Sequence, residues 1–251
     1  MEPKAQMLVC FPDSNKGDAV REYAQYLHDL LGGQICYEPM VSKEGAGRIR
    51  LAAADCDLIV FGEPEQSWLE GLAIGRHCDQ VIAQSSTSFL LARQPRWPIK
   101  SILLILRVEK TDEAAVYWLS RLAQPGRTTV TILPIVPSLP PMYSLGTGVQ
   151  AGLDVLLSSD TPSGRHLRRI AEQLKQWQIE GDLHLRQGDP DWQIRDEVGE
   201  GNYDLILIGA GPHGRFYRFL LGEFVGSLLS WVDRPLLIAQ PVHLGVEKGN
   251  G

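Results

Sequence analysis

The glycine-rich segment 209–214 is the stretch whose residue types are best suited to binding a ligand. It reads Gly-Ala-Gly-Pro-His-Gly and directly follows the apolar run 205–208. Residues 219–231 carry apolar side chains at spacings of 4, 4 and 3, which predicts a helix, and residues 236–239 form a second apolar run. A strand, a loop, a helix and a strand predict a βαβ unit. The loop of such a unit lies at the carboxyl end of a strand, where ligands bind in open α/β sheets.

The same six residues have the G-x-G-x-x-G spacing of a dinucleotide-binding loop. That chemistry requires an acidic residue at the end of the next strand, but Gln240 stands there, and the unit is the last one in the chain. NAD and FAD are therefore disfavoured. The sequence contains no G-x-S-x-G, no Walker lysine and no H-E-x-x-H motif, so we expect neither a catalytic nor a metal site.

Composition excludes several classes of function. The chain has 251 residues, a formal net charge of −6 and 44% hydrophobic residues, which argues against nucleic-acid binding by bulk charge. No apolar run is long enough to cross a membrane and residues 1–4 are polar, so we expect no membrane span and no signal peptide. The four cysteines form no CxxC pair, which favours reduced thiols and a cytoplasmic location.

Two similar series of elements follow one another along the chain. The first is expected to have strands 7–11, 34–40, 57–62 and 88–92 and helices 17–31 and 68–84. The second is expected to have strands 101–106, 128–136, 183–186, 204–208 and 236–239 and helices 111–122, 163–177, 191–200 and 219–231. The long Pro- and Gly-rich loop 137–159 lies within the second series, after the strand 128–136, and is of the kind that is functional or mobile.

Equivalent residues in the two series lie at fixed separations. Asp57 and Gly62 lie 147 residues before Asp204 and Gly209, whereas the first strands are only about 95 residues apart. We interpret this as a duplication in which the first copy lacks about 50 residues. The predicted domains are a shortened unit at 1–96, a full unit at 97–243 and a flexible tail at 244–251.

The second copy resembles the universal stress protein family. The resemblance rests on Asp204-Leu205-Ile206 and Gly209, on Leu-Leu-Gly ending 13 residues later at Gly222, and on the turn Gly188-Asp189-Pro190. It implies an α/β fold with two Rossmann-like, adenine-nucleotide-hydrolase-like parallel-sheet domains, five-stranded where complete. It also implies that the two domains pack as an internal pseudo-dimer through their last strands.

Nucleotide-binding members of that family carry the motif G-x2-G-x9-G-[S/T], in which glycines let the backbone approach phosphates. Gly209 and Gly222 supply its first and third glycines, but Pro212 replaces the second and Glu223 replaces the hydroxyl. In the first copy, Glu65 and Arg76 stand at these two positions. The acidic residue that ends the family's first strand falls on Arg107 in the second copy. We therefore expect a degraded site for ATP or AMP, lined by Gly209, Gly211, Gly214, Gly222, Glu223 and Arg107.

Three functional hypotheses follow from these observations. The first is a non-enzymatic stress-response or regulatory protein with a degraded nucleotide site in the second unit. The second is a purely structural dimerisation module, and the third, ranked last, is a nucleotide-binding protein with weak hydrolase activity. We expect an intramolecular pseudo-dimer and leave a homodimer and an unidentified protein partner open. The basic face Arg165, Arg168, Arg169 and Lys175 is expected to be the solvated side of its helix.

Overall fold

The computed structural model describes most of the two series of elements. The described residues are 5–11, 15–39, 56–62, 87–106, 112–136, 157–187, 189–209 and 227–240. The predicted α/β class is confirmed: ten strands join in one mostly parallel sheet with helices packed on it. No helix among the described residues is long and apolar enough to cross a membrane.

Among the described residues, the first unit has four strands and one helix before Pro95. These are β1 (Ala5–Phe11), α1 (Asn15–Leu31), β2 (Gly33–Pro39), β3 (Leu58–Gly62) and β4 (Ser88–Ala92). Their order in the sheet is β2-β1-β3-β4, and the strands are parallel to one another. The chain leaves α1 through Gly32, whose φ of 66° is a left-handed conformation that glycine adopts without strain.

The second unit contains the remaining strands. Its elements are β5 (Ser101–Leu106), α5 (Asp112–Leu122), β6 (Thr129–Val136), α7 (Pro162–Gln176), β7 (Glu180–Leu183), β8 (Arg186–Gln187), α8 (Pro190–Glu200), β9 (Leu205–Gly209) and β10 (Leu236–Ala239). Residues 227–231 are also helical. The order β10-β9-β5-β6-β7 is parallel throughout, and β8 pairs with the end of β6.

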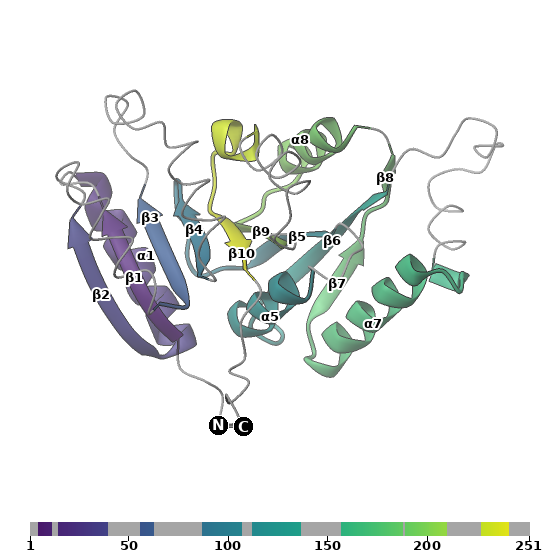
Figure 1. Ribbon diagram of the computed structural model, residues 1–251, viewed down its shortest axis with the longest axis horizontal. Coiled ribbons are helices and arrows are strands. Elements are labelled where there is room, and N and C mark those ends of the chain that lie inside the picture. The colour runs from purple at the N-terminus through teal and green to yellow at the C-terminus, as the bar shows by residue number, and fades with distance from the viewer. Residues whose placement is uncertain are drawn as a thin grey trace, which may run out of the picture.

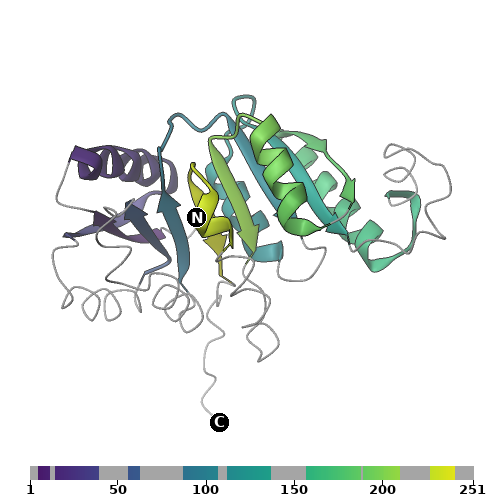
Figure 2. The same ribbon diagram turned by 90° about the horizontal axis from the view of Figure 1, so that it is seen from above.

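The two units meet through their last strands. β4 and β10 pair antiparallel, so the whole sheet runs β2-β1-β3-β4-β10-β9-β5-β6-β7. Figure 1 shows these two strands at the middle of the molecule, and Figure 2 shows them side by side from above. The helices α1 and α5 also pack against each other across this junction.

The strand registers of the two units are the same once the sequence offsets are applied. Met7 pairs with Leu58 in the first unit, and Ile102 pairs with Leu205 in the second. The register of β1 with β2 likewise matches that of β5 with β6. The register of β3 with β4 matches that of β9 with β10. Both units therefore build the same four-strand pattern, in opposite directions along the sheet.

Apolar side chains fill both faces of the sheet. One core cluster combines α1, α5 and α7 with alternate residues of the central strands, including the buried Tyr23 and Trp118. The other combines Ile194 and Val198 of α8 and Leu228 and Val232 with the remaining strand residues. Strands buried on both faces explain why their sequences are continuous apolar runs instead of alternating ones.

One predicted element differs in detail. The single short strand expected at 183–186 is divided into β7 and β8. The N–H of His184 still donates to the Ile132 carbonyl of β6 at 2.9 Å, and the paired residues stop at Leu183 and resume at Arg186. Leu185 is buried, and the His184 side chain turns to α8. The expected helix at 68–84, most of the loop 137–159 and the tail 244–251 lie outside the described residues.

Candidate functional site

The order of the strands creates a topological switch point between β5 and β9. From β5 the chain continues to β6 on one side, and from β9 it continues to β10 on the other. β5 and β9 are in register to Ile105 and Ile208, so they end beside each other. Ligands of open α/β sheets bind in the crevice outside such a switch point. We call the edge where β5, β6 and β9 end the carboxyl edge.

Gly209 lies at this carboxyl edge. It is the last residue of β9 and pairs with Ala239 of β10. Arg107 follows the last residue of β5 in the sequence, and Gly211 follows Gly209 by two positions, but both lie outside the described residues. Gly214, Gly222 and Glu223 lie outside them as well. Of the six predicted site residues the structure describes Gly209, and the ligand-binding role of all six stays a prediction.

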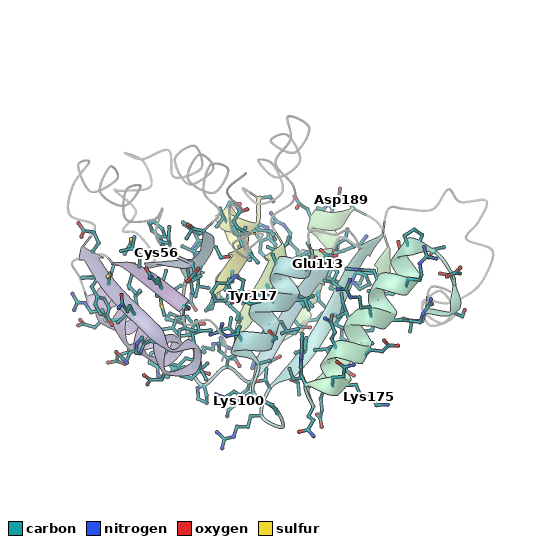
Figure 3. The ribbon with its side chains drawn as sticks, turned by 60° about the horizontal axis from the view of Figure 1, so that its bottom comes forward. Cys56, Lys100, Glu113, Tyr117, Lys175 and Asp189 are labelled. Carbon is teal, nitrogen blue, oxygen red and sulfur yellow. The ribbon has the colours of Figure 1, made fainter. Side chains whose placement is uncertain are left out.

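The first turn of α8 starts at the same edge. β8 pairs with Ile135 and Val136 at the end of β6, and α8 begins three residues after β8. The Asp189 carboxylate caps the helix by accepting hydrogen bonds from the backbone N–H groups of Asp191 (3.0 Å) and Trp192 (3.3 Å). Figure 3 shows Asp189 and Glu113 of α5 toward one edge, with Lys100 and Lys175 at the opposite edge.

A buried side chain in this turn has no hydrogen-bond partner. Gln193 is 5% exposed, and neither its Oε1 nor its Nε2 is bonded to another group. Buried polar atoms in native proteins are nearly always paired, because leaving one unpaired costs about 1–3 kcal/mol. A ligand or water with an adjacent donor and acceptor would satisfy both atoms of this amide. The first turn of α8 therefore holds one unpaired buried donor and one unpaired buried acceptor.

One turn further along α8, a buried carboxylate is fully paired. Glu197 is 2% exposed and accepts hydrogen bonds from Tyr203 Oη, from Arg186 Nε at 2.7 Å and from the His184 ring at 2.8 Å. Burial raises the pKa of Glu197, but these hydrogen bonds outweigh it and hold the pKa below its usual range. Burial and the bond to Glu197 raise the pKa of Tyr203 to about 12. This network ties α8 to β7, β8 and the start of β9.

Two side-chain pairs hold the start of α5 against α7. His166 Nε2 lies 3.2 Å from the buried Asp112 carboxylate, and Arg169 Nη1 lies 3.3 Å from Glu113. The other arginines of the basic face bind the chain as well: Arg165 bonds to Asp160, and Arg168 donates to backbone carbonyls, including that of Ser159 at 2.7 Å. Three of the four cations of this face are therefore engaged within the chain instead of forming a free anion-binding surface.

No cluster of three or more His, Cys, Asp or Glu side chains that could hold a metal ion occurs in the described part of the chain. Among the described thiols, Cys10 is buried, whereas Cys36 on β2 is exposed.

Sequence analysis missed Gln193 and Glu197. Both lie four residues apart on α8 and are adjacent in sequence to the apolar pair Ile194 and Val198, which is also four residues apart. This spacing places all four on one helix face. The spacing indicates that the two polar residues lie beside the apolar pair, whereas the partners of Glu197 come from tertiary contacts.

Comparison with known proteins identifies the family. The model of the universal stress protein family matches residues 98–240, which is more than half of the chain. A universal stress protein from Archaeoglobus fulgidus has a similar structure, with a TM-score of 0.63 and 15% identity over 95% of this chain and 97% of that one. A protein of unknown function from Pseudomonas aeruginosa PAO1 and a putative universal stress protein from P. aeruginosa UCBPP-PA14 each have a TM-score of 0.53 and 16% identity. Each of these alignments covers 94% of this chain and 82% of that one. No curated protein matches the chain.

The similar solved structures therefore establish the fold. The family model matches the second unit. Because the family model matches residues 98–240, more than half of the chain, the chain belongs to the universal stress protein family.

Proposed function

We propose that this protein is a non-enzymatic stress-response or regulatory protein whose second unit binds an adenine nucleotide weakly at the carboxyl edge. Family membership supports the role in stress response. The observation that carries the nucleotide proposal is the switch point, where β5 and β9 end side by side and Gly209 closes β9. In this proposal the protein is cytoplasmic, and it binds the nucleotide without a chemical step.

We further propose that the chain forms an internal pseudo-dimer of the predicted units 1–96 and 97–243. The equal registers of the two units and the antiparallel contact of β4 with β10 support it. Side chains from both units form hydrogen bonds across the contact of β4 with β10. Arg93 donates to the carbonyl of Leu229 at 2.6 Å, and Ser88 Oγ accepts from Trp118 Nε1 at 2.8 Å.

Weak binding follows from the residues of the phosphate loop. Pro212 has no backbone N–H to offer a phosphate, and the carboxylate of Glu223 takes the place of a hydroxyl. A carboxylate a few ångströms from a phosphate costs about 1–4 kcal/mol in partly solvated surroundings. ATP and AMP are therefore expected to bind in the second unit at high micromolar concentrations or above, and the first unit, which has Glu65 and Arg76, is expected not to bind them.

Thermal-shift titration with ATP, AMP and NAD tests the proposal. A ligand that binds only the folded state raises the melting temperature with concentration by mass action. We expect a shift with ATP and AMP, and a larger shift with NAD than with AMP would instead favour a dinucleotide site. Gly209→Ala should abolish the shift, because a Cβ at the end of β9 would obstruct the close approach of a ligand.

Gly199→Ala is the matched control. Gly199 lies on α8, and a Cβ added there meets nothing within 4 Å. This variant should keep the ligand shift of the wild type. The absence of any shift with ATP or AMP in the wild-type protein would refute nucleotide binding and leave the structural dimerisation module as the function to test.

A further inference from the structure

The amide of Gln193 constrains what can bind at the carboxyl edge. Oε1 is an acceptor and Nε2 is a donor, both atoms are buried, and neither has a partner. The neighbouring Ile194 lies in the core cluster that contains Ile105 and Ile208, each one residue before the end of its strand. The first turn of α8 therefore packs on the face of the sheet that carries Ile105 and Ile208.

The surroundings of this amide suit a neutral, donor-rich group better than a phosphate. The free N–H groups at the start of α8 are already capped by Asp189, so they are not available to an anion. Asp191 Oδ1, in the same turn, is a further buried acceptor without a partner. Two unsatisfied acceptors and one donor complement the amino group and ring nitrogen of an adenine edge, or a sugar hydroxyl.

We propose that Gln193 recognises the adenine base of the nucleotide bound at the carboxyl edge, so that the base, and not the phosphates, supplies most of the binding. This inference rests on the proposed function and adds the residue and the part of the ligand that determine affinity. A glutamine amide pairs in a bidentate manner with the adjacent donor and acceptor of adenine. Guanine presents two acceptors on the corresponding edge, so one hydrogen bond would be lost.

The sequence of the phosphate loop, residues 209–223, also favours binding through the base. Its sequence has lost the second glycine and the hydroxyl of the family motif and has gained Glu223. Each added phosphate therefore gains little at this site. Adenosine, AMP and ATP should bind with dissociation constants within about threefold of one another, whereas GMP should bind about tenfold more weakly than AMP.

The test is calorimetric titration of the full chain with adenosine, AMP, ATP and GMP, in the wild type and in Gln193→Leu. The variant should lose about tenfold in affinity for AMP and should no longer discriminate AMP from GMP. Its unfolding temperature without ligand should be equal or higher, because leucine removes two unpaired buried atoms. Gln193→Met serves as a second variant of similar length.

Gln176→Leu is the control, since it makes the same chemical change at the exposed end of α7. It should bind as the wild type does. If the wild type binds AMP and Gln193→Leu and Gln193→Met bind it equally well, the base is recognised elsewhere and this inference is wrong while the proposed function stands. ATP binding tenfold or more tightly than adenosine would also overturn it. If no nucleotide binds the wild type, both proposals fail.

Discussion

The Asp204 carboxylate accepts a hydrogen bond from the backbone N–H of Ser101 at 3.1 Å, and a second from Lys100 at 2.9 Å. The first unit contains the same arrangement, in which Asp57 accepts from the N–H of Gln6 at 2.8 Å. In both units the backbone N–H of the aspartate donates in return, to Ser101 and to Gln6. Each aspartate thus ties the start of one central strand to the start of its neighbour.

Replacing Asp204 by alanine should lower the free energy of unfolding by about 1–3 kcal/mol, because two backbone N–H groups lose their acceptor. Asp57→Ala should cost less, since only one N–H is affected. Urea unfolding of the two variants measures this difference. Asp204→Asn keeps an acceptor oxygen and should recover part of the loss. Equal stability of Asp204→Ala and the wild type would contradict the structural role and reopen a functional one.

The contact between the units depends on the buried hydroxyl of Ser88. It accepts hydrogen bonds from Trp118 Nε1 at 2.8 Å and from the backbone N–H of Gln240 at 3.1 Å, and Ser88 is 1% exposed. Ser88→Ala should lower the free energy of unfolding by about 1–3 kcal/mol, since the indole N–H would be buried without this acceptor. Tryptophan fluorescence and urea unfolding measure the effect.

Ser120→Ala is a suitable control for that experiment. The Ser120 hydroxyl bonds only locally, donating to the Tyr117 carbonyl within α5. It should change the stability by less than about 0.5 kcal/mol. If Ser88→Ala is as stable as this control, the junction does not depend on the hydroxyl.

The acid stability of the protein should depend on Glu197. Its pKa is lowered in the folded state, so its stabilisation is present above the unfolded pKa of about 4.3 and is lost as the pH falls through the folded value. Glu197→Gln leaves Arg186 without one of its carboxylates and should cost on the order of 3 kcal/mol at pH 7. Unfolding curves of the two proteins should converge as the pH approaches 3. A difference that stays constant from pH 7 to pH 3 would refute the charged network.

Tyr203 should produce the opposite pH dependence at high pH. Its folded pKa of about 12 exceeds the ordinary value of about 10. Its stabilisation is therefore complete below pH 10 and is lost as the pH rises toward 12. A phenolate absorbance titration should show one group near pH 12 in the wild type that is missing in Tyr203→Phe. A wild-type curve identical to that of Tyr203→Phe would contradict this assignment.

The strands were predictable because their burial on both faces produces continuous apolar runs, such as Leu205 to Ile208. The repeat stays a hypothesis, indicated by Asp57 and Asp204, each of which directly precedes a central strand. The polar network of Glu197 was not predictable from the sequence. It joins side chains from three segments, and their proximity depends on the crossover of α8. The division of β7 from β8 was missed for the same reason: the hydrogen bond of His184 to Glu197 is tertiary, and the local apolar pattern at 183–185 suggests an unbroken strand.

A gain of function tests whether the phosphate loop is degraded. Glu223→Ser restores the hydroxyl of the family motif and removes a carboxylate, so phosphate repulsion of about 1–4 kcal/mol should be relieved. ATP should then bind at least about fivefold more tightly, while adenosine, which carries no phosphate, should bind as before. Calorimetric titration of both ligands measures this. Arg76→Ser is the matched control, because it makes the equivalent change in the first unit, which is proposed not to bind nucleotides. If Glu223→Ser leaves the affinity for ATP unchanged, the carboxylate does not face the phosphates, and the weakness of the site must arise from Pro212 or from the missing acidic residue at Arg107.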